Sequence, residues 1–127
     1  MKINKILVVV LAIFIPYILL MTGVRLVMTP AFPAMEYERA GFPQDPYGFT
    51  IQERTKWADY AVSYLTNDAG IEFLGHLQDE TGQKMFMPDE LTHMVDVKDV
   101  VTATSLVWYI FGGVGIAILL WFVIMRQ

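Results

Sequence analysis

Two histidines are the side chains best suited to proton transfer at neutral pH, and one of them lies among charged residues. His93 is preceded by Glu90 and followed by Asp96 and Lys98, whereas His76 has a poorer setting. A helix places Glu90 and Asp96 about one turn on either side of His93. Carboxylates there orient an imidazole and favour its charged form, which suits a general base. The alternative is a surface histidine with ordinary salt-bridge neighbours.

A second candidate site lies inside the first of two long apolar runs, where Arg25 and Tyr17 are polar. A charge within a membrane span indicates function by default, and eight helical residues separate the two side chains by about 80°, so they can share a cavity. Two other interpretations stay open. Arg25 is near the end of the run and can extend to the interface, and Tyr17 can be a packing residue whose hydroxyl bonds a neighbouring carbonyl.

Metal and thiol chemistry have little support in this sequence. Glu90 and His93 form one Glu-x-x-His pair, whereas a dimetal carboxylate site needs two such pairs on inward-facing helices. The chain has no cysteine, which excludes a thiolate nucleophile and a disulfide of its own. We therefore expect no metal site and no cofactor.

The distribution of charge predicts the fold class. All 13 acidic residues lie between Thr29 and Thr102, and the apolar runs 6–28 and 103–125 contain none. Each run is long enough, at about 35 Å of helix, to cross a hydrocarbon core. We expect a mainly α membrane protein in which two transmembrane helices, 6–28 and 103–125, are joined by a small, largely helical extracytoplasmic cap, 29–102.

Basic residues predict the orientation of the two helices. Lys2 and Lys5 precede the first run and Arg126 follows the second, so both termini are expected in the cytoplasm and the cap outside. A cleaved signal peptide is the alternative for the first run, but that run is too long and contains Arg25. The net charge of -4 and the acidic cap argue against a nucleic-acid partner.

One segment of the cap has a sequence pattern that predicts both where a helix begins and which of its faces is buried. Thr50 and Glu53 have the spacing of a capping box, which predicts a helix beginning after Thr50. Trp57, Tyr60 and Tyr64 follow at helical spacing, so we expect them to form its buried face.

Prolines and turns divide the rest of the cap. Pro30 and Pro33 are expected to end the first helix, because proline cannot continue the backbone ladder. The polar turn 79–82 before residues 84–87 predicts a small β-hairpin. Pro88 is expected to open a helix that runs, unbroken or with one kink, into the second apolar run.

Small residues in the second run predict a helix–helix contact. The glycines are Gly112, Gly113 and Gly115, and Gly113 with Ala117 has small-xxx-small spacing. Such a surface lets another helix approach closely. The partner is either the first run or a helix of another subunit.

Three segments of the chain resemble a known family. They are residues 37–42, residues 47–50 with Glu53 and Arg54, and Glu90–Lys98, and they are similar to the extracytoplasmic motifs of a bacterial integral-membrane family that includes the lipoprotein intramolecular transacylase. The resemblance covers essentially the whole chain. Family members typically have four membrane helices, and this chain resembles the N-terminal half, without the later helices and the second histidine that complete the family's active site.

The resemblance implies acyl transfer in the bacterial cytoplasmic membrane. The N-terminal cysteine amine of a diacylglyceryl lipoprotein would attack its own sn-2 ester, with His93 as general base and Arg25 or Tyr17 stabilising the oxyanion. Glu90, Asp96 and Lys98 would support His93, and the partner is a membrane lipid or lipoprotein. The rival hypothesis is a non-catalytic accessory or scaffold subunit. Both stay open, because a half-length chain lacks the later active-site residues.

Overall fold

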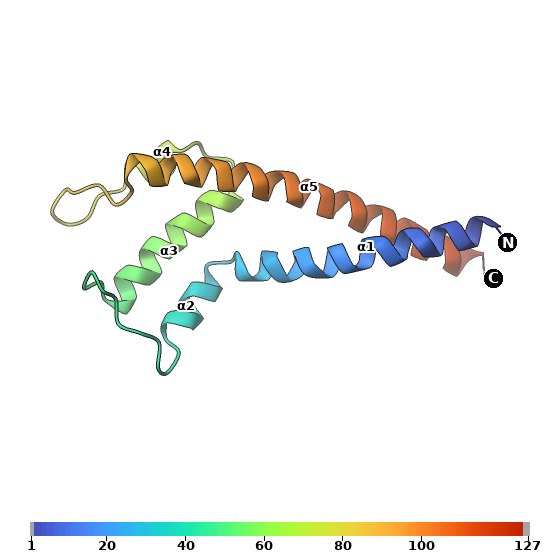
Figure 1. Ribbon diagram of the computed structural model, residues 1–127, viewed down its shortest axis with the longest axis horizontal. Coiled ribbons are helices and arrows are strands. Elements are labelled where there is room, and N and C mark those ends of the chain that lie inside the picture. Colours follow the sequence, from blue (N-terminus) through green and yellow to red (C-terminus); the bar gives the residue numbers. More distant parts are fainter. Residues whose placement is uncertain (1, 126–127) are drawn as a thin grey trace. The chain divides into compact units, whose positions relative to one another are not determined.

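The computed structural model describes residues 2–125, with side chains from Asn4 onward. These residues form five helices: α1 (Lys2–Val27), α2 (Ala31–Tyr37), α3 (Ile51–Thr66), α4 (Glu72–Gly75) and α5 (Pro88–Ile124) (Figure 1). They divide into two compact units. The hairpin unit combines the described residues of Met1–Arg25 and Ala103–Gln127, and the middle unit is Leu26–Thr102. Each unit is described separately below.

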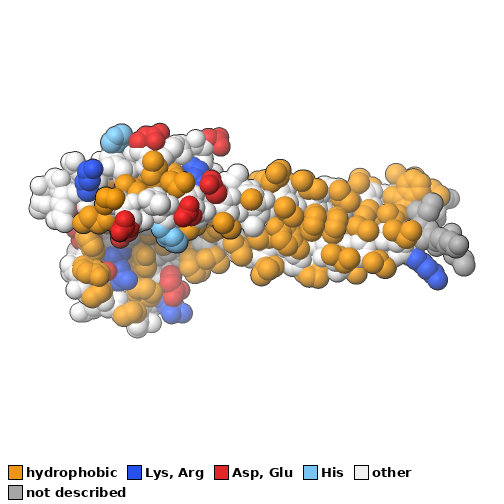
Figure 2. Space-filling model, turned by 45° about the horizontal axis from the view of Figure 1, so that its top comes forward, with side chains coloured by type: hydrophobic (Ala, Val, Ile, Leu, Met, Phe, Trp, Pro, Cys, Tyr) orange, Lys and Arg blue, Asp and Glu red, His pale blue; other side chains and the backbone are white. Residues whose placement is uncertain are grey.

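The mainly helical class is confirmed. The described residues contain no strand, and α1 and α5 are each long and apolar enough to cross a membrane. Figure 2 shows hydrophobic side chains over most of the face drawn for the hairpin unit, whereas Asp and Glu side chains gather on the middle unit. Arg126, which entered the orientation argument, lies outside the described residues.

The hairpin unit is held by side chains that recur every three or four residues on both helices. On α5 the facing positions are Thr104, Trp108, Phe111, Gly115, Ile118 and Phe122, all buried or half-buried. The rings of Phe14 and Phe111 stack with their centroids 3.9 Å apart, and Tyr17 meets Phe111 edge-on at 5.2 Å. An alternation of four and three gives an average repeat of 3.5 residues, which is the spacing that keeps one seam of a helix against its neighbour.

One glycine of the second apolar run makes the close approach. Gly115 is buried, and a Cβ added there would lie 3.8 Å from Cδ1 of Ile18 and 3.9 Å from Cδ2 of Leu11. A Cβ added at Gly112 or Gly113 would meet nothing within 4 Å. The first apolar helix is therefore the partner of Gly115, and the other two glycines are open.

The capping box at the start of α3 is confirmed. The Thr50 hydroxyl accepts from the Glu53 N–H at 3.2 Å, and Glu53 Oε2 accepts from the Thr50 N–H at 2.8 Å. The pKa of the Glu53 carboxyl is lowered by the bond from the Thr50 N–H and by a second bond, 2.8 Å long, from the Thr50 hydroxyl to Oε2, because both favour the charged form.

Burial along α3 increases towards its end. Tyr64 has 2% of its surface exposed, whereas Trp57 and Tyr60 are half-buried. Phe73, beside the fully buried Leu74 of α4, has its ring 6.0 Å from Tyr60 and 6.5 Å from Tyr64. The expected buried face exists, but its centre is Tyr64 and not Trp57.

Two expectations for the middle unit need correction. Pro33 does not end a helix, because α1 already ends at Val27 and Pro33 lies in the first turn of α2, where a missing N–H costs nothing. The β-hairpin before Pro88 is reduced to an isolated antiparallel bridge between Gln78 and Lys84. Its turn is held by the Asp79 carboxylate, which accepts from the Thr81 and Gln83 N–H groups, and the Asp79 N–H donates to the Gln83 carbonyl at 2.9 Å.

The prediction of an unbroken helix from Pro88 into the second apolar run is confirmed, because α5 covers Pro88–Ile124. Glu90 Oε2 accepts from the Met87 N–H at 2.7 Å, so a carboxylate holds the start of this helix. Acidic side chains at a helix N-terminus also stabilise the helix, because their negative charge interacts favourably with the positive end of the helix dipole.

Candidate functional site: an arginine cluster and an exposed histidine

Arg25 is the centre of a polar cluster inside the hairpin unit. Its Nη1 donates to the Ser105 hydroxyl at 2.8 Å, and its Nη2 donates to the Tyr109 hydroxyl at 3.2 Å. The guanidinium carbon lies 5.1 Å from the ring centroid of Trp108 and 5.3 Å from that of Tyr109. These are distances at which an aromatic ring attracts a cation. The arginine is thus held by α5, and not extended freely.

Tyr17 lies on the same helix but makes a different contact. Its hydroxyl donates to the Thr104 carbonyl at 2.9 Å, so its proton is already used. Trp108 Nε1 similarly donates to the Ile18 carbonyl and the Thr22 hydroxyl, each at 3.2 Å. For Tyr17, this is the packing arrangement in which a mid-span hydroxyl bonds a neighbouring carbonyl.

His93 is exposed in the middle unit. Within the described residues it makes no ion pair or side-chain hydrogen bond, and Glu90 directs an oxygen to the start of α5. Asp96 is also exposed and unpaired among the described residues. His76, at the end of α4, is exposed as well. The imidazole of His93 is therefore accessible, and its two nitrogens are uncommitted in this part of the chain.

Lys98 fastens α5 to the end of α3. Its Nζ donates to the Ala69 carbonyl at 2.6 Å and to Asn67 Oδ1 at 3.2 Å, and it lies 4.1 Å from the ring centroid of Tyr64. A cation is favoured there because the last carbonyls of a helix carry partial negative charge. Burial raises the pKa of Tyr64, and the charges of nearby carboxylates act in the same direction.

The loop before α3 is contacted by Arg54, whose Nη1 donates to the Pro43 carbonyl at 3.0 Å. Arg54 contacts the adjacent rings of Tyr37 and Phe42, with its guanidinium carbon 4.7 and 4.8 Å from their centroids, and its Nε is 3.4 Å from Asp45 Oδ2. Gly48 has a φ of 88°, a conformation that suits glycine at this turn. A cavity of about 350 Å³ lies between this loop and the start of α3.

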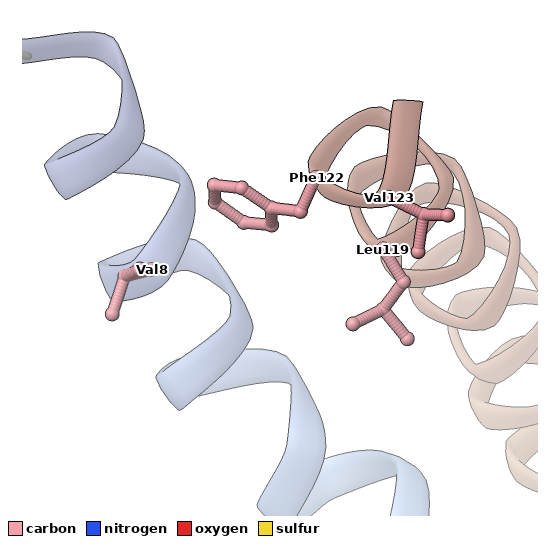
Figure 3. Close-up of a pocket in the computed structure, with 4 residues that line it drawn as sticks. All are labelled: Val8, Leu119, Phe122 and Val123. Atoms are coloured by element: carbon pink, nitrogen blue, oxygen red, sulfur yellow. The ribbon is translucent and has the colours of Figure 1, made fainter. Parts of the chain in front are cut away.

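The hairpin unit has a cavity that carries no chemistry. It is an open hollow of about 410 Å³, lined by Val8 of α1 and by Leu119, Phe122 and Val123 of α5. Figure 3 shows Phe122 directed from α5 towards α1. All four side chains are apolar, so this space suits hydrocarbon and not a reacting group.

Metal ligands are dispersed. Among residues 2–125, no group of three or more His, Cys, Asp or Glu side chains is arranged to hold a metal ion.

Ser105 and Tyr109 were not identified as site residues from the sequence. Each lies at least 80 positions from Arg25. The one available signal is a serine and a tyrosine four residues apart on an apolar helix, which a helix places on one face.

The fold and the cluster define a helical protein with two membrane-length apolar helices joined at one end by an arginine bound to hydroxyl and aromatic side chains. Residues 9–127 match the family model for the lipoprotein intramolecular transacylase Lit, and the chain belongs to this family. The apolar helices and a lipoprotein-processing family together indicate membrane association.

A relative provides a measure of length. An uncharacterized protein of Aquifex aeolicus is 33% identical over 95 residues, which are 75% of this chain and 44% of that protein. The chain thus spans less than half the length of this curated relative. No solved structure matches the chain.

Proposed function

We propose that this chain takes part in intramolecular acyl transfer on a diacylglyceryl lipoprotein. The amine of the N-terminal cysteine attacks the sn-2 ester carbonyl, so that a C–N bond forms and the C–O bond to the glyceryl oxygen breaks. The proton lost by the amine is returned to the glyceryl oxygen as it leaves. Membership of the family, over residues 9–127, is the observation that carries this proposal.

His93 is the residue proposed to move the proton. It is exposed on α5, and no described side chain occupies its nitrogens. A free imidazole can accept the amine proton and then donate it to the glyceryl oxygen. Asp96 is the better candidate to orient it, because Glu90 already accepts from the Met87 N–H. Lys98 supports the same helix by fastening it to the end of α3.

Arg25 is the preferred group for stabilising the tetrahedral oxyanion. Tyr17 is the weaker candidate, because its hydroxyl proton is donated to the Thr104 carbonyl. Arg25 retains N–H groups that the Ser105 and Tyr109 hydroxyls do not use. Preorganised donors aimed at developing charge are an effective catalytic device in a water-poor site.

The proposed location is the bacterial cytoplasmic membrane, with both termini in the cytoplasm and residues 29–102 outside. Lys2 and Lys5 before the first apolar run support this orientation. A reporter that is active only outside the cytoplasm should be active when inserted at Thr81, in the exposed turn, and silent when fused after Gln127. The reverse pattern would overturn the orientation.

A non-catalytic accessory or scaffold subunit is the second candidate. It is favoured by the open surface at Gly112 and Gly113, where nothing lies within 4 Å of an added Cβ. Small residues on an exposed helix face allow close approach of another membrane helix.

The test is mass spectrometry of a lipoprotein N-terminal peptide after co-expression in a host without N-acylation activity. The 127-residue chain and the whole product of its gene are compared, each as wild type, His93→Gln and the matched control His76→Gln. Loss of the base should reduce the product by about 10²- to 10⁴-fold, whereas the control should keep wild-type activity. Full activity of His93→Gln would disprove the general-base role. Absence of product from correctly inserted full-length protein would favour the scaffold.

A further inference from the structure

The arginines of the described residues differ in how their charge is balanced. Arg39 forms an ion pair with Glu36 at 2.9 Å, and Arg54 lies 3.4 Å from a carboxylate oxygen of Asp45. Arg25, which is half-buried, has no ion pair among residues 2–125. Its hydrogen-bond partners are the hydroxyls of Ser105 and Tyr109, which are neutral.

The guanidinium also has unused hydrogen-bonding capacity. It carries five N–H donors, and two of them are used, one on Nη1 and one on Nη2. The remaining three have no acceptor among the described residues. A bidentate contact with an anion needs two donors, so the cluster can still make one.

Aromatic rings and hydroxyls hold this cation in one place. Trp108 and Tyr109 lie 5.1 and 5.3 Å from the guanidinium carbon, and Ser105 fixes Nη1 at 2.8 Å. Trp108 is itself anchored through its donation to the Ile18 carbonyl. A guanidinium held in this way loses little conformational freedom when it binds a ligand, which favours affinity.

The position of Arg25 along α1 indicates which kind of anion lies close to its guanidinium. Arg25 is two residues before the end of α1 at Val27, about 3 Å of helical rise from the end of the membrane-length apolar segment. That is the depth at which the headgroup phosphates of a bilayer lie. The two non-bridging oxygens of a phosphodiester, like those of a carboxylate, match a guanidinium fork.

We infer that Arg25, with Ser105, Trp108 and Tyr109, forms a binding site for the phosphodiester of a membrane phospholipid. The lipid supplies the countercharge that the described residues lack, and its acyl chains lie along the apolar helices. This inference goes beyond acyl transfer and does not depend on it, because it follows from the charge balance of the cluster. A phospholipid here would compete with a reacting ester for the same guanidinium.

Native mass spectrometry of the delipidated, detergent-solubilised protein tests the inference. The protein is titrated with phosphatidylglycerol, with diacylglycerol of the same acyl chains and with inorganic phosphate. We expect phosphatidylglycerol to bind at least about tenfold more tightly than diacylglycerol, since charge-assisted hydrogen bonds are stronger than neutral ones. Inorganic phosphate should bind weakly, because it lacks the chains that contact the helices.

Variants assign the binding to the cluster. Arg25→Gln should reduce phosphatidylglycerol binding to the level of diacylglycerol, whereas the matched control Arg39→Gln should leave it unchanged. Equal binding of both lipids by the wild type would overturn the inference without any variant, even if Arg25→Gln fails to fold. Binding of inorganic phosphate as tight as that of the phospholipid would show a free-anion site instead. Active protein that shows no phospholipid preference would refute this inference and leave the acyl-transfer proposal standing.

Discussion

Replacement of Lys98 by methionine tests how α5 is fastened to the middle unit. Methionine keeps most of the aliphatic length but has no charge and no donor. The change removes the bonds to the Ala69 carbonyl at 2.6 Å and to Asn67 Oδ1 at 3.2 Å, together with the contact 4.1 Å from the Tyr64 ring. It leaves the Ala69 carbonyl and the Asn67 amide oxygen without this partner.

The expected cost follows from these contacts. A hydrogen bond to a charged group contributes about 1.5 to 3 kcal/mol, and a partly exposed cation–π contact adds about 0.5 to 1 kcal/mol. Because Lys98 is half-buried, the desolvation of its charge offsets part of the gain from the hydrogen bonds and the cation–π contact. We therefore expect Lys98→Met to lower the stability of the middle unit by about 2 to 3 kcal/mol.

Hydrogen exchange followed by mass spectrometry measures this loss where it should occur. At about 1.4 kcal/mol for each tenfold change, amides around Asn67–Phe73 should exchange roughly 30- to 150-fold faster in Lys98→Met. Lys84→Met is the matched control, because Lys84 is exposed and its side chain has no described contact. Lys98→Arg should recover part of the protection, since it keeps the charge.

A change below about threefold in Lys98→Met, or an equal change in Lys84→Met, would refute the reasoning. Either result would mean that packing around Tyr64 holds α5 and α3 together without the lysine.

Three further predictions concern the core, the cap of α3 and the hairpin seam. Leu74→Ala should destabilise the middle unit by about 2 to 5 kcal/mol in thermal unfolding, because Leu74 is fully buried. Trp57→Ala should cost less, because Trp57 is only half-buried. The reverse order would show that the core is centred elsewhere. Glu53→Gln should lower the melting temperature near neutral pH, where the lowered pKa of the Glu53 carboxyl stabilises the folded state. The difference from wild type should shrink as the pH falls below the ordinary carboxyl pKa of 4.5, because the folded carboxyl is then protonated and the stabilisation is lost. A difference independent of pH would contradict this prediction. Gly115→Leu should destabilise the hairpin unit by about 1 to 3 kcal/mol through overpacking, whereas Gly113→Leu should be near neutral, and equal thermal shifts would disprove the assigned seam.

Local features were predictable because the interactions that make them span four residues or fewer. The capping box joins Thr50 to Glu53, and its spacing is visible in the sequence. The course of α5 into the second apolar run followed from the lack of a breaking residue between Leu91 and Gly112. The short helix α2 was missed, because Pro33 indicates a helix end and a helix first turn equally well.

The candidate site was predictable only in part. His93 and Arg25 were found because a histidine among carboxylates and a charge in an apolar run are unusual in themselves. Their roles remain proposals. The spacing predicted Glu90 as a partner of His93, but the same carboxylate suits a helix start equally well, and it accepts from the Met87 N–H.

The sequence by itself determined where the apolar helices lie and which residues could carry charge into them, since composition and short-range spacing fix both. The tertiary structure decided which side chains meet. It brought the hydroxyls of Ser105 and Tyr109 into hydrogen bonds with Arg25, and Asn67 into a hydrogen bond with Lys98. It also packed Gly115, and not Gly113, against α1. These choices depend on how each helix is rotated about its own axis, and that rotation is set by the packing of a whole seam of side chains and not by any single residue.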